Sequence, residues 1–301
     1  MSEKNFENVD VSVIVPLFHG STYINNLLQM IKKNTEVAKL IKVELVFVND
    51  SPDNVPDYPD YFKDWNANFT VRFVFNRENL GIQRARLCGV EHSHGKYLLF
   101  LDQDDEISDD AISKLYDAVQ SGDISVSNWS KEVPSGRKIV TKDMSAKIEC
   151  YSINRFSFGG NFIGPPCHCL IKYDCLPSCW KNRIMKINGA DDYLLWMGML
   201  AEKRKFVHCD GKLYVHKYHD NCFSNDELNI LKSEDEAFKL AADEYDIAPF
   251  WRWIHIRYIR KRIRSYEIKQ KNGSMIKRRA LMILYPEQLL LRIMEKCGIY
   301  V

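Results

Sequence analysis

The chain has 301 residues, a hydrophobic content of 46% and a formal net charge of +2 at pH 7. This composition is typical of a globular protein with a buried core, and it argues against a largely disordered chain. No stretch approaches the roughly 20 apolar residues that a membrane-spanning helix needs. The polar start, Met1 to Asp10, lacks the apolar segment of an export signal. We therefore expect a cytoplasmic protein, and any membrane contact would be peripheral, at the inner face of the plasma membrane.

The positive charge is concentrated toward the C-terminal end. Residues 251–279 contain eleven Lys and Arg against one acid, Glu267, which gives this segment a net charge of +10 and leaves −8 for the rest of the chain. A segment of this kind is expected to face an anionic partner or solvent.

Hydrophobic patterns predict alternating strands and helices over the first 121 residues. Apolar and β-branched runs indicate buried strands at 11–16, 43–48, 71–75 and 97–101. Helical spacing occupies 23–33 and 82–92, and Ser108 is expected to cap a third helix whose first turn holds Asp109 and Asp110. This alternation predicts an α/β fold, with a mostly parallel sheet flanked by helices on both faces.

After residue 121 the pattern becomes less regular. We expect short strands and loops over 122–190, a helix at 191–201, an extended segment at 205–218 and mostly helices from 226 onward. The predicted domains are an α/β domain over 1–225, with halves of about 1–121 and 122–225, and a helical basic region over 226–301.

An acidic group, Asp102-Gln103-Asp104-Asp105, directly follows the fourth predicted strand. Three carboxylates within four residues repel one another unless a cation or solvent compensates their charge. Oxygen ligands suit a hard cation, Mg²⁺ or Mn²⁺, which binds one or two carboxylates and keeps positions for phosphate and water. The alternative is a solvated acidic turn. Because ligands of parallel sheets bind beyond the carboxyl ends of the strands, the position favours a metal site.

Asp50 lies at the carboxyl end of the second predicted strand, and its side chain has two possible roles. It accepts hydrogen bonds from a nucleoside, or it stabilises a turn. Farther along, Asn79 to Gly81 form a glycine turn before a helix that carries Arg84 and Arg86. A helix amino terminus with arginines is a natural environment for a diphosphate. An ordinary exposed helix face is the alternative.

Asp191 and Asp192 precede the apolar run of the helix predicted at 191–201. A carboxylate at this position can take a proton from an acceptor hydroxyl. The alternative is that one of the two caps the helix. His216 and His219 follow in the extended segment, where each is a candidate metal ligand or phosphate donor, or has a structural role.

Nine cysteines occur in the chain, an odd number that fits free thiols better than a disulfide framework. Four of them, Cys167, Cys169, Cys175 and Cys179, raise the question of a zinc site. Their spacing lacks the paired ligands of structural zinc sites, so we favour free thiols that are buried or line a site.

Taken in order, these motifs resemble the family 2 inverting glycosyltransferases with the GT-A (Rossmann-like) fold, in particular bacterial enzymes of polysaccharide and lipopolysaccharide synthesis. The resemblance extends from Val11 to about Ser224. The positions that match are Pro16, Asp50, Asn79, Gly81, Arg86, Asp102, Gln103, Asp104, Asp105, Asp191, Asp192, His219 and Ser224. Asn49 and Asp191 replace the more usual Asp and Glu, and His19 stands where Asn is common.

The resemblance implies transfer of one sugar from a nucleotide-diphosphate sugar, with a UDP-sugar expected, to the hydroxyl of a saccharide acceptor. A divalent cation, Mn²⁺ or Mg²⁺, would be the cofactor. Asp192 would be the general base. The implied donor-binding residues are Pro16, Asp50, Asn79, Gly81, Arg86, Asp102 and Gln103, the implied metal ligands are Asp104, Asp102 and His219, and Asp105 and Asp191 would support the site or contact the acceptor. The Gln-x-x-Arg-Trp motif of processive synthases is missing, which favours single-sugar transfer.

The basic C-terminal region suggests where the acceptor is. Ile254, Ile256, Ile259 and Ile263 alternate with arginines, and residues 289–294 add apolar surface. Such a segment can lie on an anionic lipid leaflet, which would fit a lipid-linked acceptor. A solvated helix face and an oligomer contact are the alternatives.

Three other functions were weighed. A GT-A-like nucleotidyltransferase would use the same metal, but it needs a Gly-rich basic loop where Phe18 to Ser21 stand. A nucleic-acid-binding protein would use the basic region, yet the rest of the chain is net acidic. A catalytically inactive scaffold is disfavoured because the carboxylates that the reaction needs, among them Asp102, Asp104 and Asp192, are retained. We therefore expect an enzyme with no nucleic-acid partner.

Overall fold

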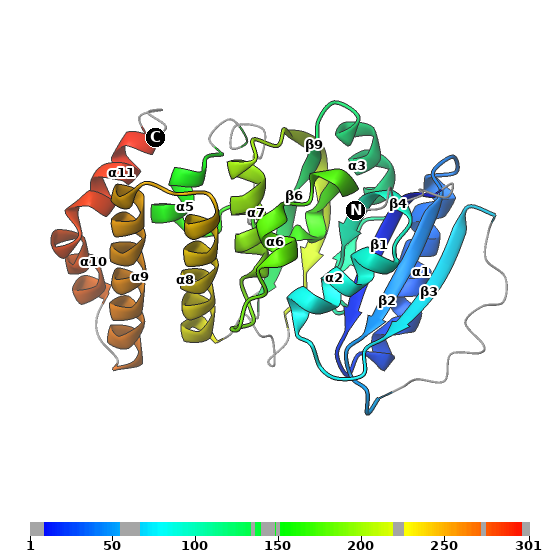
Figure 1. Cartoon of the computed structure of the whole chain (residues 1–301), viewed down its shortest axis with the longest axis horizontal. Helices are drawn as coiled ribbons and strands as arrows, with labels where there is room; N and C mark the ends of the chain where they lie inside the picture. Colours follow the sequence, from blue (N-terminus) through cyan, green and yellow to red (C-terminus); the bar gives the residue numbers. More distant parts are fainter. Residues whose placement is uncertain are drawn as a thin grey trace. The chain divides into compact units, whose positions relative to one another are not determined.

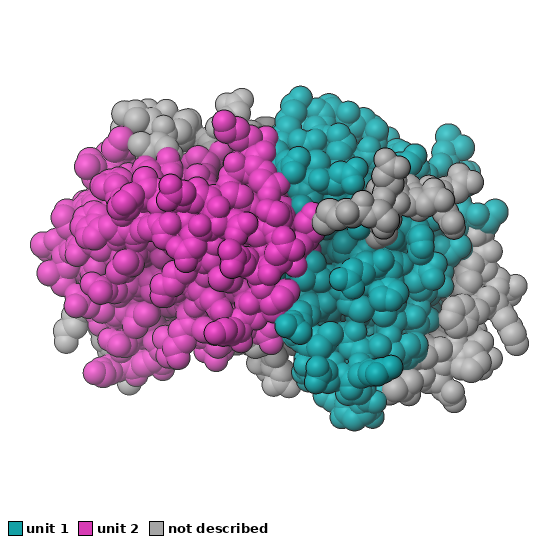
Figure 2. All heavy atoms as spheres, viewed as in Figure 1, with its two compact units in different colours: residues 1–148, 165–176, 204–219 teal, residues 149–164, 177–203, 220–301 magenta. Residues whose placement is uncertain are grey.

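The computed structural model describes residues 9–54, 67–133, 136–139, 148, 151–218, 226–271 and 275–296. The chain divides into two compact units that interleave along the sequence (Figure 2). Unit 1 comprises residues 1–148, 165–176 and 204–219, and unit 2 comprises 149–164, 177–203 and 220–301. Every described strand belongs to unit 1, whereas the described part of unit 2 is helical. The domain boundary near residue 225 stays a prediction.

Four parallel strands form the first half of the sheet in unit 1 (Figure 1). They are β1 (Val9–Leu17), β2 (Val43–Asn49), β3 (Phe69–Phe75) and β4 (Gly95–Phe100), in the spatial order β3-β2-β1-β4. Val13 on β1 is in register with Leu45 on β2 and Leu99 on β4. All four predicted strands are confirmed. Their carboxyl ends lie along one edge, where the candidate donor residues follow them.

Beyond β4 the sheet becomes mixed. The remaining strands are β5 (Glu106–Ile107), β6 (Ile124–Val133), β7 (Gly136–Ile139), β8 (Cys169–Lys172) and β9 (Phe206–His216). β8 is antiparallel to both β4 and β6, and β9 is parallel to β6. The predicted parallel arrangement thus holds for the first four strands, and among the described residues one helix links β1 to β2 and another links β3 to β4.

Three helices cover the two faces of this sheet in unit 1: α1 (Ile24–Val37), α2 (Ile82–His92) and α3 (Ala111–Val119). Alternate residues of a strand point to opposite faces. Val11, Val13 and Val15 therefore pack with α1 and α3, whereas Ile14 faces α2. At Gly89 of α2, an added Cβ would lie 2.4 Å from the Ile14 side chain, so the glycine permits the close approach of helix and sheet.

The predicted cap of α3 is wrong. The N-cap residue is Asp110, without a side-chain capping bond, and the first helical turn contains no acid. Ser108 instead donates its hydroxyl to the Asp110 carboxylate (2.7 Å), which also pairs with Lys114 at 2.7 Å. Asp110, which the sequence analysis placed in the first turn of the helix, thus lies just before it and pairs with Lys114.

Unit 2 contains seven helices within its described residues. They are α5 (Ile153–Gly159), α6 (Ser178–Asn182), α7 (Asp191–Ala201), α8 (Glu227–Glu244), α9 (Pro249–Gln270), α10 (Met275–Leu284) and α11 (Pro286–Lys296). The bounds of α7 agree with the helix predicted at 191–201. Tyr193 to Met199 are all buried, which explains why α7 is apolar around its whole circumference. Within the described residues, no helix is long and apolar enough to cross a membrane.

Candidate active site

Asp50 is buried directly after β2 and holds the turn that begins α2. Its Oδ1 accepts hydrogen bonds from Asn76 Nδ2 (2.8 Å) and the Leu80 amide (2.9 Å), and its Oδ2 accepts from the Gly81 amide (2.9 Å). The amides of the two residues that directly precede α2 thereby find acceptors from a distant part of the chain. Asp50 is thus a structural anchor of this turn, and its contact with a nucleotide stays a prediction.

Other predicted donor residues lie along the same edge of the sheet. Pro16 is buried in β1, in register with Val48 of β2. Asn79 is exposed, and its Oδ1 accepts from the Gly81 amide (3.0 Å). Gly81 is the N-cap of α2 with a φ of 80°, a conformation that favours glycine. The glycine turn predicted before this helix is confirmed.

Arg86 connects α2 to the acidic turn. Its Nη2 donates to Asp102 Oδ1 (2.6 Å), and only 5% of the Arg86 side chain is exposed, against 29% for Asp102. Arg84, one residue away from the buried face, is exposed. The two arginines that were predicted to face a diphosphate therefore differ. Arg86 is buried and orients a carboxylate, while Arg84 remains accessible to solvent.

Gln103 joins the acidic turn to the end of β1. Its Oε1 accepts from the Phe18 amide (2.9 Å) and its Nε2 donates to the Phe18 carbonyl (3.1 Å). His19, the residue after Phe18, has a φ of 48°, and its backbone amide donates a hydrogen bond to Ser51 Oγ (2.7 Å). Asn tolerates this left-handed conformation well, which gives a physical reason why Asn is common at this position. The donor-binding role of Gln103 stays a prediction.

Asp105 is fully buried and connects the acidic turn to the end of β9. It accepts hydrogen bonds from the Tyr214 hydroxyl, from the Lys217 amide (2.8 Å) and, through a 3.2 Å contact, from His216 Nδ1. A buried carboxylate is stable only with such partners. Asp105 therefore supports the site, and its burial leaves it poorly placed to contact an acceptor.

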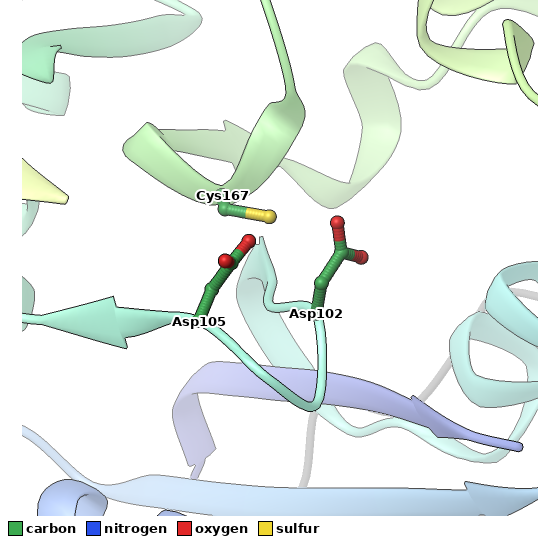
Figure 3. Close-up of side chains that lie close together, drawn as sticks. All are labelled: Asp102, Asp105 and Cys167. Carbon is green, nitrogen blue, oxygen red and sulfur yellow. The ribbon is translucent and has the colours of Figure 1, made fainter. Parts of the chain in front are cut away.

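Figure 3 shows the side chains of Asp102 and Asp105 rising from one turn toward Cys167. A carboxylate oxygen of each and the Cys167 Sγ lie within 4.8 Å of one another. Burial, reinforced by the charges of Asp102 and Asp105, raises the pKa of the Cys167 thiol well above its usual value. A neutral thiol is a poor ligand for a hard cation, so the cysteine does not suit Mg²⁺ or Mn²⁺.

The residues that fit a divalent cation are Asp102 and Asp104. Both are partly exposed on the turn after β4, whereas the oxygens of Asp105 are engaged by β9. A hard cation needs only one or two carboxylates when phosphates complete its shell. The third predicted ligand, His219, lies outside the described residues, as does Ser224.

The other cysteines considered for zinc, Cys169, Cys175 and Cys179, are free and buried, as expected. Among the described residues, no group of three cysteine or histidine ligands comes together. Burial raises the pKa of Cys175 and of Cys179 to about 11, so these thiols are protonated at neutral pH. They have the properties of small apolar core residues.

In unit 2, Asp191 and Asp192 open α7, but neither is its N-cap, which is Ala190. Asp191 is buried, whereas Asp192 is partly exposed. Asp192 Oδ1 accepts from the Tyr193 amide (2.8 Å), and its Oδ2 accepts from Asn161 Nδ2 (2.7 Å). Of the two carboxylates, Asp192 is thus the accessible one. Its role as general base stays a prediction.

Sequence reasoning missed two contributors to these clusters, Tyr214 and Asn161, and it gave Cys167 only as a free thiol that is buried or lines a site. Each touches its aspartate across more than 30 residues of chain. No local pattern marks such contacts. Near Asn161 the sequence carries only a general break signal, the pair Gly159-Gly160 directly before it.

Residues 12–178 match the profile of the family described as Glycosyl transferase family 2. The chain belongs to this family. The putative glycosyltransferase EpsH of Bacillus subtilis (strain 168) is 28% identical over 141 residues, 46% of this chain and 39% of EpsH. The minor teichoic acid biosynthesis protein GgaB of the same bacterium is 31% identical over 111 residues, 36% of this chain and 12% of GgaB. The chain thus matches well under two thirds of the length of these two relatives.

A likeness in fold accompanies the family membership. Staphylococcus TarS (S. aureus, residues 1–349), solved in complex with UDP-GlcNAc, aligns with a TM-score of 0.59 and 16% sequence identity, covering 84% of this chain and 72% of that one. The GT-A fold expected from the sequence is confirmed by this match.

The His216–Asp105 contact predicts a pH-dependent stability. Burial lowers the pKa of His216, but the hydrogen bond and charge of Asp105 outweigh it and raise the pKa above its usual value. The stabilisation of the fold by this contact is therefore complete below about pH 6.5, the pKa of histidine in the unfolded chain. It is lost as the pH rises through the raised pKa of His216 in the folded protein. Urea unfolding measures this effect. Between pH 6 and pH 9, the free energy of unfolding should fall by on the order of 1 kcal/mol more for the wild type than for His216→Gln.

The exposed His92 supplies the matched control, because His92→Gln should keep the wild-type dependence on pH. Equal slopes for wild type and His216→Gln would contradict the account of this contact.

Proposed function

We propose that this chain transfers one sugar from a nucleotide-diphosphate sugar to an acceptor hydroxyl, with inversion at the anomeric carbon, in the synthesis of a surface polysaccharide or lipopolysaccharide. The observation that carries this proposal is the edge of the parallel sheet, where Asp50, Asp102 and Asp104 follow β2 and β4 beside the start of α2. Membership of glycosyl transferase family 2 and the UDP-GlcNAc bound by TarS support a nucleotide-sugar donor.

The donor site would be organised by α2 and the acidic turn. The positive amino-terminal end of α2 favours the diphosphate. Asp50 keeps this end in place through the Leu80 and Gly81 amides. Arg86 acts by holding Asp102, whose exposed side is then available to the ribose or the cation.

Asp102 and Asp104 would hold Mg²⁺ or Mn²⁺, with His219 as a further predicted ligand. When bound, the cation offsets the negative charge that develops on the departing diphosphate. On the acceptor side, Asp192 would take the proton of the acceptor hydroxyl while that oxygen forms a bond to the anomeric carbon and the bond to the diphosphate oxygen breaks.

Substitution of the base is the direct test. We expect Asp192→Asn to lower kcat by about 10² to 10⁴, the usual scale for loss of a general base, with donor binding unchanged. Transfer is measured with UDP-, GDP- and dTDP-sugars, using slow donor hydrolysis to find the donor first. The exposed Asp246 provides the control Asp246→Asn, with normal turnover expected. Near-wild-type turnover of Asp192→Asn would reject the assignment.

Metal removal is a second test. We expect EDTA to abolish transfer and added Mn²⁺ or Mg²⁺ to restore it, because the carboxylates alone repel the diphosphate. Asp104→Asn should need at least about 10-fold more metal for half-maximal activity, since one charged ligand is lost. The exposed Asp109→Asn is the control. Full activity in EDTA would exclude the cation from the reaction.

The acceptor side of the proposal concerns the C-terminal helices. The buried side of α9 contains Ile254 and Ile259, so these residues do not form the apolar surface expected from the sequence. A different set is exposed, which we call the C-terminal apolar surface. It comprises Phe250, Trp253 and Ile256 on α9, Ile283 and Leu284 on α10, and Leu289, Leu290 and Ile293 on α11.

These helices pack together around Arg257, which donates to Glu287 (2.6 Å) and stacks on the rings of Trp253 and Tyr285. Exposed Arg260 and Arg264 continue the face of α9 that carries Trp253. The excess positive charge of residues 251–279 opposes self-association and favours an anionic surface. We therefore propose contact with anionic lipid, which would suit a lipid-linked saccharide acceptor.

Vesicle co-sedimentation tests this contact. We expect binding to vesicles with 30% anionic lipid and little to purely zwitterionic ones, since each cation near the surface adds about 1 kcal/mol. Trp253→Ser with Leu290→Ser should weaken partitioning at least about 10-fold. Leu40→Ser is the control, because Leu40 is 95% exposed but belongs to unit 1. Binding that is independent of anionic lipid would contradict the proposal.

A further inference from the structure

The short segment between α5 and residue 165 is held by hydrogen bonds to the first turns of α7. We call residues 160–164 the brace loop. Trp196 Nε1 donates to the Gly164 carbonyl (2.8 Å), and Asn161 Nδ2 donates to Asp192 Oδ2 (2.7 Å). Just before the loop, the Tyr193 hydroxyl donates to the Phe156 carbonyl (2.7 Å). Three residues of α7, Asp192, Tyr193 and Trp196, therefore hold the stretch of chain from residue 156 to residue 164.

The start of the brace loop is fixed by close packing. Gly160 has a φ of 71°, which favours glycine. A Cβ added there would lie 2.3 Å from the hydroxyl oxygen of Tyr258 on α9. That oxygen in turn accepts from Arg262 Nη1 (2.7 Å). The backbone that carries Asn161 is thus packed against a buried tyrosine as well as tied to α7.

The amide of Asn161 has one orientation. Its Oδ1 accepts from the Gly164 amide (2.9 Å), and a backbone N–H can only donate. The other end of the side chain must therefore be the donor, and it faces Asp192. Since Asp192 Oδ1 also accepts from the Tyr193 amide (2.8 Å), each carboxylate oxygen receives at least one hydrogen bond and the plane of the carboxylate is fixed.

We infer that Asn161 is a positioning residue for Asp192: it holds the carboxylate in the ionised state and in the orientation needed to take the acceptor's proton. This inference rests on the proposed function, since it requires Asp192 to be the base. Hydrogen bonds to the charged form of a carboxylate stabilise that form. A carboxylate that is already held in the reactive orientation loses less conformational entropy on reaching the transition state. Asn161 thereby acts on turnover, through Asp192, rather than on binding.

Two variants separate this role from simple folding of the loop. Asn161→Ala removes both hydrogen bonds. Asn161→Asp has nearly the same shape and keeps the acceptor for the Gly164 amide, but it replaces the donor facing Asp192 with an oxygen. Both should lower kcat by about 10-fold to 100-fold, the scale of a hydrogen bond to a charged group, with acceptor KM within about 2-fold. Asn182→Ala, at an exposed asparagine of unit 2, should have normal kinetics.

The pH profile and a double-mutant cycle provide readouts that a structural role would not move. In Asn161→Ala the acidic limb of the kcat profile should shift to higher pH, because the ionised carboxylate has lost a donor. In the Asp192→Asn background, Asn161→Ala should have no further effect on the residual rate, since it acts through the missing base. Thermal unfolding midpoints confirm that the variants fold.

The outcomes are distinguishable. If Asp192→Asn is inactive and Asn161→Ala has wild-type kcat and pH profile, the inference fails and the proposed function stands. An equal loss from Asn161→Ala in both backgrounds also overturns it, because the asparagine then acts independently of Asp192. Wild-type activity of Asp192→Asn overturns the proposed function and the inference together.

Discussion

The partly buried contact between Arg86 and Asp102 is the interaction on which the candidate donor site depends. Arg86 is carried by α2, and Asp102 belongs to the turn after β4, so the contact at 2.6 Å sets the acidic turn relative to the helix. Loss of the Asp102 carboxylate would deprive the buried guanidinium of a charged partner, which destabilises the fold. Asp50 completes the arrangement from the other side by holding the Leu80 and Gly81 amides. The carboxylates are therefore fixed before any ligand binds.

Both units hold an aspartate carboxylate through hydrogen bonds from side chains and backbone amides. In unit 1, Asp105 is held by Tyr214 and the Lys217 amide, and it anchors the turn that presents Asp102 and Asp104. In unit 2, Asn161 and the Tyr193 amide hold Asp192. Polar side chains that are themselves tied to backbone groups fix the acids within narrow limits, as preorganised sites require. This common feature is consistent with a reaction that needs one acid group for the donor and one for the acceptor.

Local patterns predicted much of this protein. The four parallel strands, α2 and α7 follow from apolar periodicity, and the positions of Asp50 and Asp102 at strand ends follow from the alternation of strands and helices. The predicted cap of α3 was wrong because a side chain of α1 takes this role: Asn34 Oδ1 accepts a hydrogen bond from the Ile112 amide (3.1 Å) in the first turn. The contacts of Cys167, Tyr214 and Asn161 were beyond prediction, since they join residues far apart in the chain. Likewise, periodicity alone did not show that Ile254 and Ile259 are buried while Trp253 is exposed.

The central claim is that the acidic turn after β4 binds a nucleotide diphosphate together with a divalent cation. Calorimetric titration of UDP into the protein tests it most directly, without an acceptor or knowledge of the sugar. In Mn²⁺ the wild type should bind one UDP per chain, and EDTA or Asp104→Asn should weaken binding at least about 10-fold, as expected when a cation that would offset the charge of the diphosphate is lost. Equal affinity under all three conditions would contradict the account.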